Sequence, residues 1–187
     1  MARSPFEWFK TWRHGRGFGV HSPLAFSLLG EVLRKPDGVA YYDEEAISRI
    51  FPRGRQRRIA RTVYRLAAYV NPASVAVLAH GARQALWSRL IHSALPSARV
   101  SAKVHSDSRL VIVDDMSRYT PAPPPEADDT KGVYTIFTCL DGNDARSEFD
   151  SRISAGEFQG LVIDSRRDMA LSVMRRGVSR QTIAARF

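Results

Sequence analysis

Two adjacent carboxylates, Asp114 and Asp115, are the residues that most clearly indicate chemistry. They directly follow Leu110–Val113, a continuous apolar run with the length and composition of a buried strand. Open parallel sheets bind their ligands at the carboxyl ends of the strands, so both side chains are candidates for contacting a ligand. The same pair could instead begin a loop or cap a helix, and the sequence does not decide between these interpretations. Two adjacent acids are too few to indicate a metal site, and no metal is expected.

Other candidate residues follow the neighbouring apolar runs. His80 and Gly81 come after Ser74–Ala79, and Asp107 comes after the weaker run Val100–Val104. A glycine after one strand lets the backbone approach a nucleotide, and an acid after the next can bind ribose hydroxyl groups. The candidate cofactor-binding residues are therefore His80, Gly81, Asp107, Asp114 and Asp115. Arg83 falls in the first turn of the next helix, where a cation opposes the helix dipole. It could accompany an anionic ligand bound at that helix N-terminus, but we expect it to extend into solvent.

Arginines are dense just upstream of these strands. The chain carries a formal net charge of +9, and a helical segment contains Arg57, Arg58, Arg61 and Arg65. Like charges three and four residues apart repel, so an anionic partner such as nucleic acid would relieve the repulsion. A solvated helix face is the alternative. The single cysteine, Cys139, cannot form an internal disulfide and has no flanking base, and no Cys/His cluster has metal-ligand spacing.

Composition places the chain among globular proteins. Its 187 residues are 44% hydrophobic and 25% charged, enough for one domain with a core. No apolar run approaches the roughly 18 residues of a membrane span. The segment Met1–Arg16 lacks the apolar core of a secretory signal. These features predict a cytoplasmic protein without a membrane partner, and they do not indicate its oligomeric state.

The elements that must position these residues can be inferred from hydrophobic periodicity. Residues 1–52 show no strand pattern, and Ser22-Pro23 and Asp43 are typical helix starts, so this region is predicted to form a helical cap. Beyond it, helices and strands alternate, which favours a parallel sheet. The final strands, Met169–Met174 and Gln181–Phe187, are predicted to form a hairpin that turns at Gly177. The other predicted elements are helices over Arg55–Val70, Ala82–Leu95 and Asn143–Ser154, and strands over Ser74–Ala79, Val100–Val104, Leu110–Val113, Val133–Leu140 and Leu161–Ile163.

Segments near both ends of the chain resemble bacterial class I S-adenosylmethionine-dependent methyltransferases. The front segments are Gly17–Pro23, which reads Gly-Phe-Gly-Val-His-Ser-Pro, then Tyr41-Tyr42 and Tyr69–Pro72. The back segments are Val162–Asp164, Met169–Met174 and Arg176–Phe187. The resemblance implies an α/β fold with a Rossmann-like methyltransferase-type sheet, mostly parallel with an antiparallel C-terminal hairpin. It divides the chain into an N-terminal helical cap, residues 1–52, and a methyltransferase-like domain, residues 53–187.

The resemblance also implies a cofactor, S-adenosylmethionine, and a set of residues near the substrate. His21, Ser22 and Tyr42 are then candidates for a lid or a substrate contact, although His21 and Ser22 could equally cap a helix. No catalytic residue or substrate is indicated.

The cofactor loop departs from the family pattern. Leu78–Gln84 has a single glycine, and Asp107, the only candidate acid for the ribose, comes late after its strand. We therefore predict a methyltransferase-like protein with a degenerate cofactor loop, weakly active or inactive. Two alternatives remain open: an active enzyme that holds the donor near Gly81 and Asp114, and a basic nucleic-acid-binding or protein-interaction module on the same scaffold.

Overall fold

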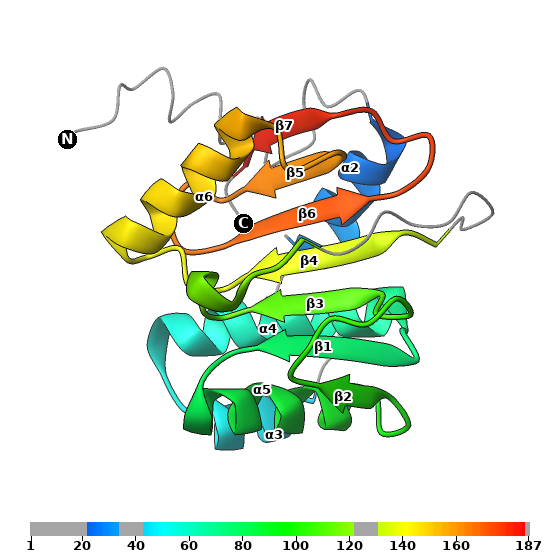
Figure 1. The fold of residues 1–187 in the computed structure, drawn as a ribbon. Coiled ribbons are helices and arrows are strands. Elements are labelled where there is room, and N and C mark those ends of the chain that lie inside the picture. The colour runs from blue at the N-terminus through cyan, green and yellow to red at the C-terminus, as the bar shows by residue number, and fades with distance from the viewer. Residues whose placement is uncertain (1–21, 34–42, 122–130, 186–187) are drawn as a thin grey trace.

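A computed structural model describes residues 22–33, 43–121 and 131–185, which form a seven-stranded sheet with helices on both faces (Figure 1). The strand order is β2-β1-β3-β4-β6-β5-β7. Every neighbouring pair is parallel except the two made by β6, which runs antiparallel to both β4 and β5. The predicted α/β class with a mostly parallel sheet is confirmed. The strands are β1 (Ser74–Leu78), β2 (Arg99–Ser101), β3 (Leu110–Val113), β4 (Val133–Phe137), β5 (Leu161–Asp164), β6 (Ala170–Met174) and β7 (Gln181–Ala184).

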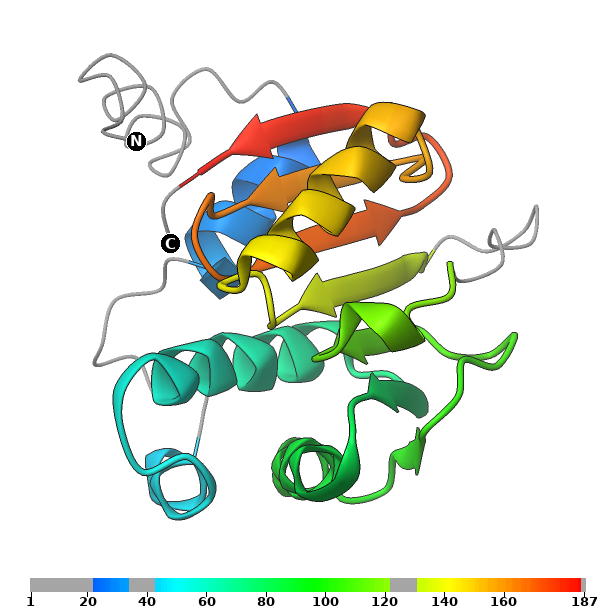
Figure 2. The same ribbon diagram turned by 60° about the vertical axis from the view of Figure 1, so that its left-hand side comes forward.

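Helices cover the sheet unequally. The elements α2, η1, α3, α4 and α5 pack on one face, whereas α6 and η2 pack on the other (Figure 2). Two starts are confirmed: Ser22 caps α2 by accepting a hydrogen bond from the Ala25 backbone N–H, and Asp43 caps α3 through Ala46. The helical elements are α2 (Pro23–Ser27), η1 (Leu28–Leu33, π-helical), α3 (Glu44–Ile50), α4 (Gly54–Val70), α5 (Gly81–Ala94), η2 (Met116–Arg118, a 3₁₀ turn) and α6 (Asn143–Ala155).

The larger of two hydrophobic cores lies between the sheet and α4 and α5. Helix α4 buries Ile59, Val63 and Leu66 there, the apolar stripe that its periodicity predicts, and Asn71 ends the helix in the left-handed conformation. The described part of the N-terminal helical region shares this core. The second core lies under α6 and contains the aromatic side chains Phe137 and Phe149. Within the described ranges, no helix is long and apolar enough to cross a membrane.

The predicted hairpin between the last two strands is wrong. The residues after Gly177 carry the chain across to the far side of β5, where β7 pairs in parallel, and β6 lies between β4 and β5. The antiparallel pair forms one connection earlier, between β5 and β6. There the Ser165 hydroxyl accepts hydrogen bonds from the backbone N–H groups of Arg167 and Met169 and so closes the short loop. A turn residue such as Gly177 indicates that the chain reverses but not which strand it joins.

The strand order creates a crevice at one end of the sheet. From β1 the chain moves outward to β2 and then returns to the other side of β1 as β3. Connections leaving the carboxyl ends of β1 and β3 therefore diverge, which is the arrangement at which open α/β sheets bind ligands.

Candidate functional site

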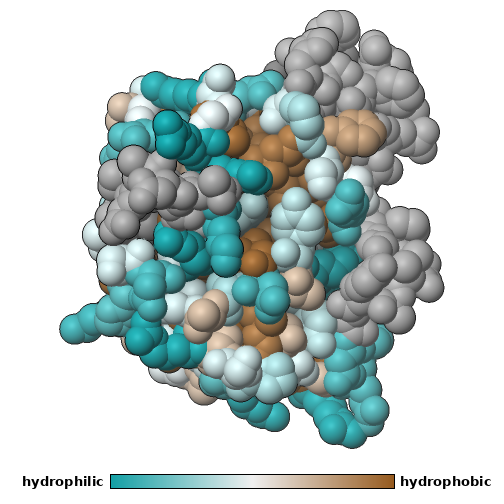
Figure 3. All heavy atoms as spheres, turned by 90° about the vertical axis from the view of Figure 1, so that its right-hand side faces the viewer, coloured by the Kyte–Doolittle hydropathy of each residue, from teal (hydrophilic) through white to brown (hydrophobic). Residues whose placement is uncertain are grey.

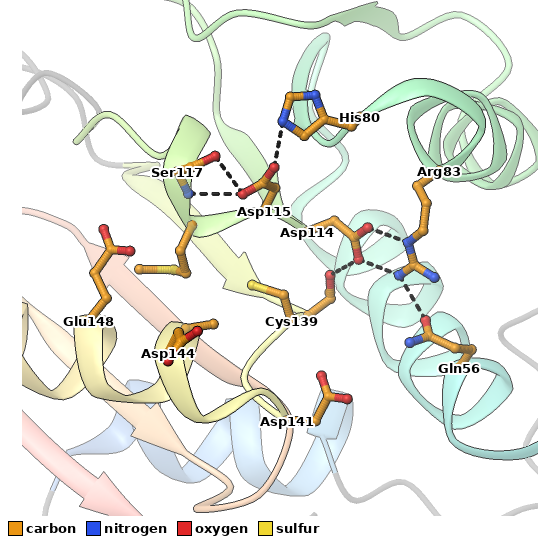
Figure 4. Close-up of a pocket in the computed structure, with 13 residues that line it drawn as sticks. Gln56, His80, Arg83, Asp114, Asp115, Ser117, Cys139, Asp141, Asp144 and Glu148 are labelled. Carbon is orange, nitrogen blue, oxygen red and sulfur yellow. Dashed lines mark hydrogen bonds and ion pairs between the residues drawn. The ribbon is translucent and has the colours of Figure 1, made fainter.

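A cleft of about 540 Å³ opens at the carboxyl ends of β1, β3 and β4 (Figure 4). We call it the carboxyl-end cleft. Its walls are the residues that follow these strands and side chains from the first turns of α4, α5 and α6. Three of the candidate cofactor-binding residues, His80, Asp114 and Asp115, line it together. The rule that ligand residues follow parallel strands therefore locates the cleft correctly.

Asp115 both caps a helical turn and lies against His80 across the cleft. One carboxylate oxygen accepts hydrogen bonds from the backbone N–H and the hydroxyl of Ser117, at 2.9 and 2.8 Å, at the start of η2. The other oxygen lies 2.6 Å from His80 Nε2. The cap interpretation and the cleft-lining interpretation of Asp115 are thus both correct.

Asp114 is buried and fully engaged inside the protein. Its side chain is 4% exposed, and its two oxygens accept hydrogen bonds from the Arg83 guanidinium. One of them also accepts a bond from the Thr138 hydroxyl at 2.8 Å. Arg83 donates further to Gln56 Oε1 at 3.1 Å, and its bond to Asp114 raises the pKa of the guanidinium.

The expectation that Arg83 extends into solvent is therefore wrong. Its guanidinium lies across the junction between β1 and β3 and points at Asp114 (Figure 4). A buried carboxylate without a partner costs several kcal/mol, whereas a cation in the first turn of a helix costs only about 0.3–1 kcal/mol. The need to pair the buried Asp114 carboxylate therefore determines the conformation of the Arg83 side chain.

The loop after β1 is short. Only Ala79 and His80 separate β1 from α5, and Gly81 begins the helix with a φ of +48°. A Cβ on Gly81 would meet no atom within 4 Å. Glycine is thus favoured by backbone conformation and not by a close approach at this position. Gly81 adjoins His80 but does not line the cleft.

The candidate ribose acid lies at the wrong end of the sheet. Strand β2 ends at Ser101 and is followed by Ala102 and Lys103, so no carboxylate stands at its carboxyl end. Asp107 instead forms an ion pair with Arg99, the first residue of β2, near the amino ends of the strands. Asp107 does not join the carboxyl-end cleft, because β2 is shorter than predicted and the chain has already turned back.

Ser22, the one lid candidate among the described residues, does not line the cleft either. Ser22 accepts a hydrogen bond from the Ala25 backbone N–H at 3.3 Å, and it lines a separate groove near the amino ends of the strands. The helix-cap interpretation of Ser22 is therefore correct. His21 and Tyr42 lie outside the described residues.

Sequence reasoning missed the part of the cleft that follows β4. Thr138, Cys139 and Asp141 come directly after this strand, and Asp144 and Glu148 lie in the first turns of α6. Applying the same strand-end rule to the predicted Val133–Leu140 strand would have found Asp141, whereas Thr138 and Cys139 follow the strand only because β4 ends at Phe137.

The surroundings of Cys139 disfavour its reactive thiolate form. Burial raises the pKa of its thiol to about 12, and the nearby Asp114 carboxylate acts in the same direction. In the described part of the chain, no three His, Cys, Asp or Glu side chains are grouped so that they could hold a metal ion.

The four α4 arginines that were predicted to bind nucleic acid, Arg57, Arg58, Arg61 and Arg65, make contacts outside their own helical turn or beyond the helix. Arg57 and Arg61 both donate to the Glu44 carboxylate in α3, and these contacts lower the pKa of Glu44. Arg58 binds Asp168 in the loop between β5 and β6. The buried Arg65 donates to the carbonyl of Leu33 and the hydroxyl of Thr62. The face predicted to bind nucleic acid is thus engaged in holding α4 to its neighbours.

Searches of known protein families, of curated proteins and of solved structures found no match to this chain.

Proposed function

We propose that the chain is a cytoplasmic S-adenosylmethionine-dependent methyltransferase-like protein whose carboxyl-end cleft binds the cofactor weakly or not at all. The family resemblance of Gly17–Pro23 and Arg176–Phe187 supports the scaffold. So does the single antiparallel strand, β6, in an otherwise parallel sheet, together with a cleft at the point where the strand order reverses. Fold alone does not establish activity, so whether the cofactor binds is argued from the residues of the carboxyl-end cleft.

The pairing of Arg83 with Asp114 is the observation on which the proposal depends. A sulfonium cofactor is cationic, and its ribose hydroxyl groups need carboxylate acceptors. Asp114 already has both oxygens occupied by Arg83, and that cation would repel a sulfonium. Displacing Arg83 would leave the buried Asp114 carboxylate unpaired at a cost of about 3 kcal/mol, which weakens binding by roughly two orders of magnitude.

Calorimetric titration of the full chain with S-adenosylmethionine and S-adenosylhomocysteine tests the proposal. We expect no saturable heat at ligand concentrations up to about 100 μM, because neither Asp114 nor the end of β2 offers a free carboxylate. Saturable binding with a Kd of about 1–10 μM would restore an active enzyme as the better explanation.

A pair of variants tests the stated cause. In Arg83→Ala the Asp114 carboxylate becomes available to a ligand, whereas Arg89→Ala removes an exposed arginine of the same helix outside the cleft. We expect S-adenosylmethionine to bind Arg83→Ala more tightly than the wild type and to bind Arg89→Ala as weakly as the wild type. Circular dichroism confirms that each variant is folded. If Arg83→Ala gains no affinity, Arg83 is not what weakens binding.

A further inference from the structure

Basic residues gather at the end of the sheet opposite the cleft. Arg99 opens β2 and Arg109 precedes β3, Lys131 lies two residues before β4, Arg175 and Arg176 follow β6, and Arg180 precedes β7. Among the described residues that flank the strands at this end, the acids are Asp107 and Glu157, and each forms an ion pair with an arginine. The described residues at this end of the sheet therefore carry mostly positive charge.

A groove of about 600 Å³ lies at this end, between α2, the C-terminal end of α4 and the β6–β7 connection. We call it the amino-edge groove. Its polar lining includes Arg175, Arg176 and Ser179, and its apolar lining includes Leu24 and Tyr69. Figure 3 looks onto this side of the molecule and shows hydrophobic surface between hydrophilic side chains.

Tyr69 and Arg175 are placed to contact a ligand. Tyr69 is 40% exposed, and Phe26 is the other large hydrophobic side chain exposed in the described ranges. Arg175 lies close enough to the Tyr134 hydroxyl to lower its pKa, which burial raises. A Cβ on Gly132 would come within 2.7 Å of the Arg175 Cβ, so the backbone at Gly132 packs directly against this arginine. These contacts fix the start of the Arg175 side chain beside the groove.

We propose that the amino-edge groove binds single-stranded nucleic acid. Guanidinium groups form charge-assisted hydrogen bonds to phosphate, and an exposed aromatic ring beside them offers a surface on which an unpaired base stacks. Arg175 and Arg176 supply the first feature and Tyr69 the second, within one groove. A duplex keeps its bases stacked inside the double helix. It would therefore bind the arginines through its phosphates but offer no base to stack on Tyr69. A lipid surface would need apolar side chains that project outward, whereas Leu24 and Val178 are only partly exposed here. The inference does not rest on the proposed function, because the two sites lie at opposite ends of the sheet.

Fluorescence anisotropy with labelled single-stranded RNA and DNA of about 12 nucleotides tests the inference on the full chain. We expect binding at about 50 mM salt that weakens steeply by about 200 mM, because phosphate contacts release counterions. In Arg175→Gln/Arg176→Gln the affinity should fall by about tenfold or more and the salt dependence should become shallower. Tyr69→Ala should lose about tenfold in affinity with an unchanged salt dependence, because stacking is not ionic.

A control of equal charge separates a specific groove from general attraction to a basic protein. Arg53→Gln/Arg89→Gln removes two exposed arginines that lie outside the groove, and it should bind like the wild type. Equal loss in both double variants would overturn the inference, as would undetectable binding of either oligonucleotide at low salt. A duplex bound as tightly as the single strand, or anionic vesicles bound with the same sensitivity to Arg175→Gln/Arg176→Gln, would also count against it.

Discussion

At the scale of the residue, several arginines act as counter-ions to buried carboxylates. Asp114, Asp164 and Asp168 have side chains at most 5% exposed, and each is held by an arginine from another element. Asp164, for example, accepts bonds at 3.0 and 3.1 Å from Arg146. The planar guanidinium can also present two of its nitrogens in a fixed fork to the two oxygens of one carboxylate, as Arg83 does to Asp114, and a lysine ammonium has no such fork. A high arginine content therefore does not by itself indicate a nucleic-acid-binding surface.

The Arg83–Asp114 pair should respond unequally to loss of either partner. Arg83→Ala leaves a carboxylate that is 4% exposed without its cation, and we expect a loss of about 3 kcal/mol in unfolding free energy. Asp114→Asn leaves Arg83, which is 40% exposed and can turn to solvent, so we expect a loss of about 1–2 kcal/mol. Urea unfolding followed by circular dichroism measures both, and the reverse ranking would contradict the assignment.

Glu44 should make stability depend on pH. Its hydrogen bonds from Arg61 and Arg57 lower its pKa from the ordinary value of 4.5. A carboxyl group with a depressed folded-state pKa stabilises the protein above its unfolded pKa, and this contribution is lost as pH falls through the folded value. We therefore expect Glu44→Gln to be less stable than the wild type at pH 7, with the difference shrinking steadily below about pH 4.5. Urea midpoints across the acidic range measure it, and a gap that persists in strong acid would contradict the role of Glu44.

At the scale of the element, local pattern predicts helices and strands but not the neighbours of each strand. Apolar periodicity placed α4 and α5 within a residue or two, and strand β3 without error. The prediction that β6 and β7 form a hairpin was wrong, because strand pairing depends on contacts between residues far apart in sequence. Helix α6 begins at Asn143, where the sequence predicts it, and Gly142 is its N-cap residue.

The candidate site was also predictable only in part, because local pattern predicts where a strand ends but not which distant residues meet there. His80, Asp114 and Asp115 were found because their position depends only on where a strand ends. Asp107 and Arg83 were misplaced because their positions depend on the length of β2 and on a buried charge elsewhere. The hydrophobic pattern predicts where strands end, but it does not predict ion pairs between residues far apart in sequence.

Close packing of β5 against β6 at Gly160 gives an element-level prediction. A Cβ at this residue would lie 2.0 Å from the Val173 carbonyl oxygen, which is backbone and cannot swing away. We expect Gly160→Ala to cost about 3 kcal/mol or more by forcing the two strands apart. Gly30 offers a matched control, because a Cβ there meets nothing within 4 Å. Gly30→Ala should be neutral or stabilising by up to about 1 kcal/mol in thermal or urea unfolding; similar losses in the two variants would contradict the prediction.

At the scale of the whole molecule, the two cores share one sheet and should unfold together. Cys139 packs against the core under α6, and its pKa of about 12 keeps the thiol protonated in the folded state. Alkylation of Cys139 at pH 8 should therefore be on the order of a thousandfold slower than in the unfolded chain. In a urea series the labelled fraction should rise at the same midpoint as the circular dichroism signal of the helices. Labelling at lower urea would show that the α6 side opens on its own.

The place of β6 in the sheet sets the order in which this protein can assemble. Strands β5 and β7 reach the rest of the sheet only through β6, which lies between β4 and β5 although it follows β5 in the sequence. During synthesis, β1 to β4 can pair as they emerge from the ribosome, but β5 has no partner until Ala170–Met174 has also emerged. A nascent chain stalled before Ala170 therefore exposes the apolar strand Leu161–Asp164, and this interval is when the protein most needs a chaperone.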